Sequence, residues 1–151
     1  MNSLAGDLAA IMGRDLDALA AGIEAYPDDA SLWRVSGNII NSGGTLALHV
    51  VGNLSHFVGA VLGGTGYVRD REAEFGDRDV SRAEILARIA ACRDEVVSIV
   101  EGLDDDLLAG PYPGTLPPHL AGTTTRRFLL HLSGHLMWHR GQLDYHRRIL
   151  A

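Results

Sequence analysis

TTTRRFLLHLSGHLMWHRGQLDYHRRI, residues 123–149, is the stretch that decides the fold of this chain. It contains no proline, and the threonines at its start are good helix caps, so it predicts one long helix. His131, His135 and His139 recur every four residues within it. Residues four apart lie about 6 Å from one another on one face of a helix. The segment therefore predicts a helix with a row of imidazoles along one face.

Three earlier segments also show the apolar spacing of helices. They cover residues 4–25, residues 45–62, and a stretch that opens at Ser81 and closes at Gly102. Ser81 is followed three residues later by Glu84, which is the spacing of a capping box. The breaks between segments are the turn-forming strings Tyr26-Pro27-Asp28-Asp29, Gly63-Gly64-Thr65-Gly66 and Gly110-Pro111-Tyr112-Pro113. Four main helices predict an all-α protein.

The lengths of the connections constrain how these helices pack. A short loop joins antiparallel neighbours, whereas the roughly 17-residue link over 64–80 could run the ~30 Å length of a bundle at about 3.3 Å per extended residue. The second and third helices can then be parallel, and the second and fourth antiparallel. We therefore predict a four-helix bundle of up-down-down-up topology, with the long connection between helices 2 and 3, in a single domain over residues 1–151.

Composition narrows the classes of function. The 151 residues carry a net charge of −6 and are 46% apolar. An acidic balance argues against broad binding to nucleic acids or anionic membranes, because both need a positive surface. Cys92 is the only cysteine, which excludes an internal disulfide and a thiolate metal cluster. We see no signal-peptide pattern and expect no stretch that approaches the ~20 apolar residues of a membrane helix, so the expected location is cytoplasmic.

The histidines gather on two of the predicted helices. Two of the seven, His49 and His56, lie in segment 45–62, and four lie in segment 123–149. One metal ion can take only one adjacent pair of the histidine row, because His131 and His139 are separated by about 12 Å of axial rise. His49 lies on the inward stripe of its helix and is the natural third ligand. We predict one divalent metal ion on His49, His135 and His139.

Other polar residues are placed near this site by spacing. Asn53 and Gln142 each lie about one turn beyond a predicted ligand and could steer a ligand or substrate, with ordinary polar filling of the bundle as the alternative. In antiparallel helices, His56 and His131 fall level with one another, so we expect them to line the site rather than bind the metal. His146, near the end of the last helix, is predicted to be a helix-end cation or a solvent-exposed residue.

The link between the second and third helices carries Tyr67, Arg69, Arg71 and Glu74. We predict that it could cover one end of the bundle and contact the substrate. Arginines there would suit an anionic substrate, such as the carboxylates of a thiol cofactor. The alternative is that these are solvated loop charges.

Two other helical metal architectures do not fit. A carboxylate-bridged di-iron bundle needs inward glutamates and Glu-x-x-His motifs, and segment 123–149 contains no glutamate. A zincin needs His-Glu-x-x-His with the glutamate as base, but Leu136 follows His135. Three neutral histidines would leave an open coordination position for water or a thiol. No protein nucleophile is evident, so the catalytic group remains unassigned beyond a metal-bound water or thiol.

The string His135-Leu136-Met137-Trp138-His139-Arg140-Gly141-Gln142 matches the His-x-x-x-His-Arg-Gly-Gln signature of the DinB-like superfamily. The segment 48–54, Leu-His-Val-Val-Gly-Asn-Leu, resembles the helix 2 element that carries the first metal-binding histidine of those proteins. The connection over 66–75 looks like that of one uncharacterised branch. The resemblance implies an up-down-down-up bundle, often dimeric, with a three-histidine site for nickel or zinc.

Relatives with known activity resemble transferases and isomerases that use low-molecular-weight thiols, including bacillithiol and mycothiol. The resemblance thus implies a metal-dependent enzyme acting on a small molecule, as a thiol-dependent S-transferase or isomerase, with metal-assisted hydrolysis close behind. The alternative is a non-catalytic metal- or small-ligand-binding module in a stress response. We expect a homodimer, and no nucleic acid or membrane partner.

Overall fold

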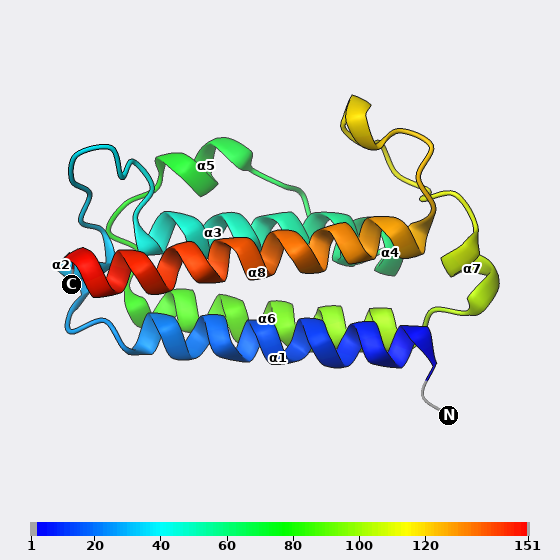
Figure 1. Ribbon diagram of the computed structural model, residues 1–151, viewed down its shortest axis with the longest axis horizontal. Coiled ribbons are helices and arrows are strands. Elements are labelled where there is room, and N and C mark those ends of the chain that lie inside the picture. Colours follow the sequence, from blue (N-terminus) through cyan, green and yellow to red (C-terminus); the bar gives the residue numbers. More distant parts are fainter. Residues whose placement is uncertain (1–2, 151) are drawn as a thin grey trace.

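The computed structural model describes residues 3–150, and between them no segment forms a β-strand. Four long helices lie side by side: α1 (Leu4–Glu24), α3 (Gly43–Leu54), α6 (Arg82–Glu101) and α8 (Thr125–Leu150) (Figure 1). Shorter helical elements are α2 (Asp29–Leu32), the π-helical η1 (Ser55–Ala60), α4 (Val61–Gly63), α5 (Arg71–Gly76), α7 (Asp105–Ala109) and the 3-10 turn η2 (Pro118–Leu120). The all-α prediction is confirmed.

The ribbon colours in Figure 1 show α1 and α8 running in one direction and α3 and α6 in the other. Helix α1 packs on α6 and α8, and α3 packs on the same two helices. The core side chains come from all four: Met12, Leu16 and Leu19 of α1, Val50 and Leu54 of α3, Ile85, Ile89 and Val96 of α6, and Phe128, Leu132 and Leu136 of α8. Their spacing of three or four residues gives each helix one buried face.

Hydroxyl caps fix where the helices begin. The Ser42 hydroxyl accepts a hydrogen bond from the backbone N–H of Thr45 (3.1 Å), so α3 starts slightly before the predicted boundary. The Ser81 hydroxyl accepts from the N–H of Glu84 (3.2 Å), as the capping-box spacing predicts. The Glu84 carboxylate pairs with Arg88 further along the helix (2.8 Å). These caps set the register of α3 and α6.

Helix α3 continues through η1 and α4 to Gly63, and Gly64 ends it in the left-handed conformation (φ 63°). The whole stretch Gly43–Gly63 is long and apolar enough to cross a membrane by length and mean hydropathy, which corrects our expectation from the sequence. Because 61% of the apolar window is buried inside the protein, the stretch fits the core helix of a soluble protein.

The link between α3 and α6 is partly helical, where the sequence predicted an extended connection. It contains α5, whose N-terminus is capped by Asp70 accepting from the N–H of Ala73 (2.9 Å). Helix α5 packs against α3 on its outer side. This places residues of the link directly over α3.

His146 differs from its prediction because it is buried, with 3% of its surface exposed. Its Nε2 lies 2.7 Å from the carbonyl oxygen of Arg34, and its Nδ1 lies 2.7 Å from the hydroxyl of Tyr26. A carbonyl oxygen only accepts, so Nε2 donates to it. The buried ring thus joins the end of α8 to the segment before α3, and both of its nitrogens are hydrogen-bonded.

Candidate metal centre

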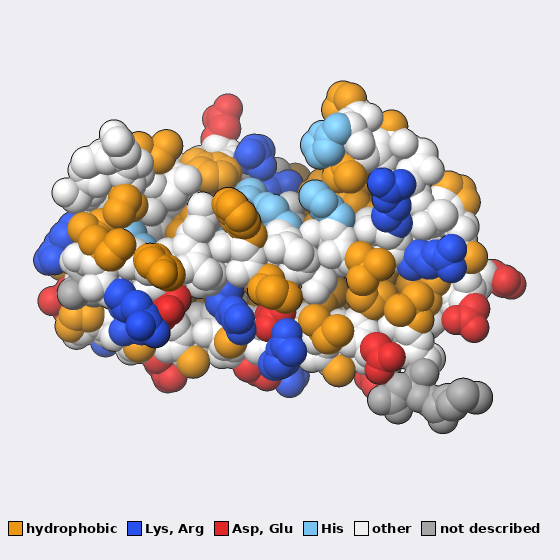
Figure 2. Space-filling model, in the orientation of Figure 1, with side chains coloured by type: hydrophobic (Ala, Val, Ile, Leu, Met, Phe, Trp, Pro, Cys, Tyr) orange, Lys and Arg blue, Asp and Glu red, His pale blue; other side chains and the backbone are white. Residues whose placement is uncertain are grey.

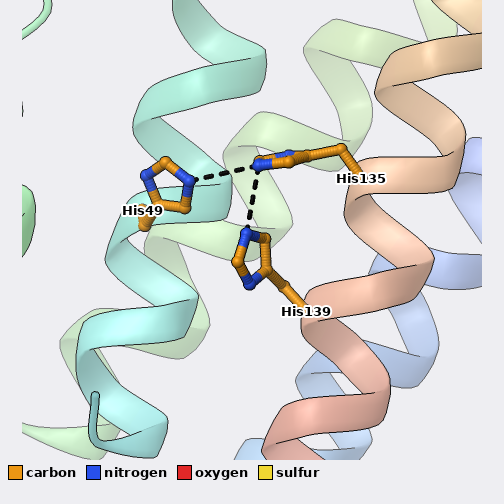
Figure 3. A group of neighbouring side chains, drawn as sticks. All are labelled: His49, His135 and His139. Atoms are coloured by element: carbon orange, nitrogen blue, oxygen red, sulfur yellow. Dashed lines mark hydrogen bonds between the residues drawn. The ribbon is translucent and has the colours of Figure 1, made fainter. Parts of the chain in front are cut away.

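Three histidine rings meet between α3 and α8 (Figure 3). The Nε2 atom of His135 lies 3.2 Å from Nε2 of His49 and 3.0 Å from Nε2 of His139. All three candidate ligand atoms lie within 4.8 Å of one another. The structure therefore brings together the three residues that the sequence singled out, although His49 and His135 are 86 positions apart in the chain.

The outer nitrogens of two rings are already engaged. Nδ1 of His49 lies 2.9 Å from Oε2 of Glu74, and Nδ1 of His139 lies 2.7 Å from Oε1 of Gln142. Both oxygens are acceptors, so both Nδ1 atoms carry the proton whenever the ring is in its neutral form, the form that binds a metal. The Nε2 atoms of His49 and His139 are then lone pairs, and both face the same nitrogen of His135.

One N–H of His135 could satisfy only one of these two lone pairs. A cation placed among the three nitrogens would accept a lone pair from each of them. In a tetrahedral site with Zn–N bonds of 2.0–2.1 Å, two ligand nitrogens are separated by about 3.3 Å. The observed separations of 3.0 and 3.2 Å are close to this spacing. The donor set thus fits a divalent ion that prefers imidazole ligands.

The surroundings favour the neutral form of His135 and His139. The pKa of His135 is lowered to about 4. Burial is the main cause, and smaller contributions come from the neighbouring His139, His49, His131 and Arg69. Burial also lowers the pKa of His139, although the hydrogen bond to Gln142 opposes the shift. A neutral imidazole is the form that binds a metal. Both rings are therefore ready to act as ligands at neutral pH.

Glu74 is the residue whose role the sequence did not predict. It was expected on a substrate-binding loop, but it lies on α5 with 5% of its surface exposed. Its carboxylate accepts from His49 and from Arg69, with Arg69 Nε at 2.6 Å and Nη2 at 2.9 Å. Burial by itself raises the pKa of Glu74, but the hydrogen bonds from Arg69 and His49 outweigh it and hold the pKa low.

The approach of Glu74 to α3 depends on Gly52. A Cβ atom at Gly52 would collide with the Glu74 carboxylate. On the other side of Glu74, between α3, α5 and α6, lies a cavity of about 440 Å³ that contains none of the three histidines. Glu74 therefore forms a wall between that cavity and His49.

The remaining candidate residues lie around the centre and differ in how far they are exposed to solvent. His131 is exposed and stacks on the ring of His135 at 6.4 Å between centroids. His56 packs edge-on against Phe57, and burial lowers its pKa. Asn53 is 8% exposed, and its Oδ1 atom has no hydrogen-bond partner. The predicted meeting of His56 and His131 is not among the contacts of either ring in the described part of the chain.

The loop arginines are occupied within the protein. Arg69 is bound to Glu74, and its guanidinium lies 5.7 Å from the centroid of Phe57. Arg71 lies over the ring of Phe75 at 5.1 Å. Tyr67 has 38% of its surface exposed and lines the cavity beside Glu74. These groups build the outer wall of the site.

The centre is open to solvent on one side. Figure 2 shows histidine side chains at the floor of a hollow between α5 and the segment that carries η2. His135 and His139 are partly exposed, whereas His49 is buried. Among the described residues, the group contains three candidate ligands and no fourth histidine, cysteine or carboxylate.

The comparison with protein families agrees with this geometry. A family model described as the DinB superfamily matches residues 12–143, a range that includes all three histidines. No curated protein and no solved structure matches the chain. Since the family model covers most of the sequence, this protein belongs to the DinB superfamily.

Proposed function

We propose that this protein binds one divalent metal ion, zinc or nickel, through His49, His135 and His139, and is a metal-dependent enzyme for a small-molecule substrate in the cytoplasm. The observation that carries the proposal is the pair of fixed Nε2 lone pairs, on His49 and His139, that face the same nitrogen of His135. The four long helices then form the up-down-down-up bundle of the superfamily.

The open side of the centre supports an enzyme over a structural site. A divalent ion with a free coordination position supplies Lewis acidity and lowers the pKa of a water or thiol that reaches it. Glu74 and Gln142 hold two of the rings through Nδ1, so that the ligand geometry persists while substrates exchange.

A thiol reactant must come from solution. Cys92 is 3% exposed, and burial raises the pKa of its thiol to about 12. It is therefore unsuited to act as a nucleophile. This supports thiol-dependent transfer or isomerisation with a low-molecular-weight thiol as co-substrate. Metal-assisted hydrolysis is the alternative reaction, which would need no thiol.

We also propose a homodimer in which a second copy covers the exposed side of α8. Trp138 is 68% exposed and Tyr145 is 70% exposed. They lie seven residues apart, on one face of the helix. Sedimentation analysis of Trp138→Lys tests this assembly, because the variant should be monomeric while the metal content is unchanged.

The metal proposal is tested by elemental analysis of untagged protein. Wild type should bind about one zinc or nickel ion per chain, and His139→Ala should bind none while it keeps its helical circular dichroism. The matched control is His119→Ala, which removes an exposed histidine of η2 and should retain the metal. Full metal retention in His139→Ala would remove this residue from the site.

Activity is tested separately. Metal-loaded protein should consume an electrophilic substrate only when bacillithiol, mycothiol or another small thiol is present. Turnover without thiol would assign hydrolysis, and absence of turnover across the thiol panel would favour a binding module.

A further inference from the structure

A second cavity, of about 300 Å³, lies between α3, α8 and the segment that precedes α3. Two of its lining residues fix its position. Leu46 precedes the ligand His49 by three residues, and Gln142 follows the ligand His139 by three. Residues three apart share one face of a helix. The cavity therefore continues the groove between α3 and α8, about one helical turn (~5 Å) along the helices from His49 and His139.

The walls of this cavity are apolar with a few neutral polar groups. Apolar surface comes from Ile39, Ile40, Leu46 and Ile149, and the carboxamides of Asn38 and Asn41 add hydrogen-bonding groups. Among the described lining residues there is no lysine, arginine, aspartate or glutamate. His146 also lines the cavity, but both of its nitrogens are engaged with Tyr26 and Arg34.

Gln142 connects the cavity with the metal centre. Its Oε1 accepts from Nδ1 of His139, and its side chain lines the cavity. The amide N–H groups of the same side chain remain available to a ligand, because no hydrogen bond from them is formed within residues 3–150. A ligand that accepts from Gln142 would thus lie next to a metal-binding ring.

We propose that this cavity binds the non-reacting part of the substrate, and that this part is uncharged, with an apolar body and a carbonyl- or hydroxyl-type acceptor. The inference rests on the proposed metal-dependent function. A charged group in this cavity would give up part of its hydration and would find no ionic partner among the lining residues, which is costly. An apolar body would gain from burial against the isoleucines. The site thus selects for neutral substrates, in contrast to the anionic substrate that Arg69 and Arg71 suggested from the sequence.

The larger cavity beside Glu74 provides a contrast within the same chain. Its lining includes the carboxylates of Asp70, Asp77 and Glu95, together with Arg88. A cationic probe would be drawn to that cavity rather than to the neutral one, whereas its carboxylates would repel an anionic probe. The charge of a small probe therefore distinguishes the two.

Three aromatic probes of nearly equal shape test the proposal: benzamide is neutral, benzoate is an anion and benzamidine is a cation. Binding to metal-free protein is measured by ligand-observed NMR. At the neutral cavity, read as the binding that Ile39→Trp removes, benzamide should bind at least ~10-fold more tightly than the other two. Ile39→Trp, which fills the cavity, should abolish benzamide binding, whereas Leu130→Trp at the exposed start of α8 should not. Asn41→Asp should shift the preference to benzamidine.

Proximity to the metal centre is tested with Co²⁺. In cobalt-loaded wild type, the paramagnetic ion should broaden the proton signals of bound benzamide. Equal binding of the three probes, no binding of benzamide, binding that survives Ile39→Trp, or absence of broadening would each overturn the proposal. Elemental analysis reads metal binding independently, so a chain without metal would count against the proposed function, while the metal-free titration judges the cavity.

Discussion

The Nδ1 atom of His49 donates to the Glu74 carboxylate over 2.9 Å, and this contact joins α3 to the short helix of the α3–α6 link. A carboxylate behind a metal-binding histidine fixes the tautomer and raises the basicity of the ligand nitrogen. Arg69 neutralises the same carboxylate, so the group can stay buried. The link thus sets the electronic properties of the centre from outside the two helices that carry its ligands.

Glu74→Gln should lower metal affinity about 10- to 100-fold, because the amide weakens the hydrogen bond that holds His49. Affinity is measured by competition with a chromophoric chelator. Glu72→Gln changes an exposed residue of the same short helix and should bind metal as wild type does. Equal affinities in the two variants would mean that Glu74 does not tune the site.

Gly52→Ala should produce a similar loss of affinity without removing any polar group. The new methyl group would displace the Glu74 carboxylate from α3. Gly134→Ala is the matched control, since nothing lies within 4 Å of a Cβ atom at that position of α8. The control should retain the metal and gain roughly 0.5–1 kcal/mol of stability. Wild-type affinity in Gly52→Ala would contradict the steric role of the glycine.

The helices and the clustering of the three histidines were predictable, because both follow from the spacing of residues along a helix. Apolar spacing locates each long helix, and the four-residue interval places His135 and His139 on one face. The contact of Glu74 with His49 was not predictable in this way. It crosses from a link of irregular spacing to a regular helix, and no period connects the two.

Two other features also depend on tertiary contacts. The π-helical turn η1 is largely apolar, like the α-helix before it, and the side chain of Glu95 packs against its Gly59. His146 appeared to be a helix-end residue, but the segment before α3 folds over it and supplies the Arg34 carbonyl. Helical spacing describes one element at a time, so it could report neither feature.

Cys92 should resist alkylation in the folded protein. Burial raises the pKa of its thiol to about 12; a hydrogen bond with Ser55 opposes this rise, and the nearby Glu95 carboxylate adds a smaller one. At pH 8 only about one thiol in ten thousand would be ionised, whereas an unfolded cysteine with a pKa near 8.5 is ionised to about a quarter. Iodoacetamide labelling followed by mass spectrometry should be roughly a thousandfold slower in native protein than in guanidinium. Rapid native labelling would reopen Cys92 as a candidate nucleophile.

Metal-free protein should lose stability as the pH falls from about 6.5 towards 4. His135 has a folded-state pKa of about 4, lowered mainly by burial, whereas an unfolded histidine titrates near 6.5. Between these values the unfolded chain binds a proton that the folded chain does not, so the free energy of unfolding decreases as the pH falls. One such group contributes at most ~1.4 kcal/mol per pH unit.

Glu74 does not interfere in the upper part of this window, because its lowered pKa means that its stabilising contribution is lost only below about 4.5. Urea denaturation at pH 7, 6 and 5 measures the effect. The matched variant His135→Phe keeps an aromatic ring without a titrating group, so its stability should change less with pH than that of wild type. Parallel pH profiles for the two proteins would show that the buried rings accept protons as freely in the folded chain as in the unfolded one, and a site of that kind would not hold three neutral imidazoles ready for a metal ion.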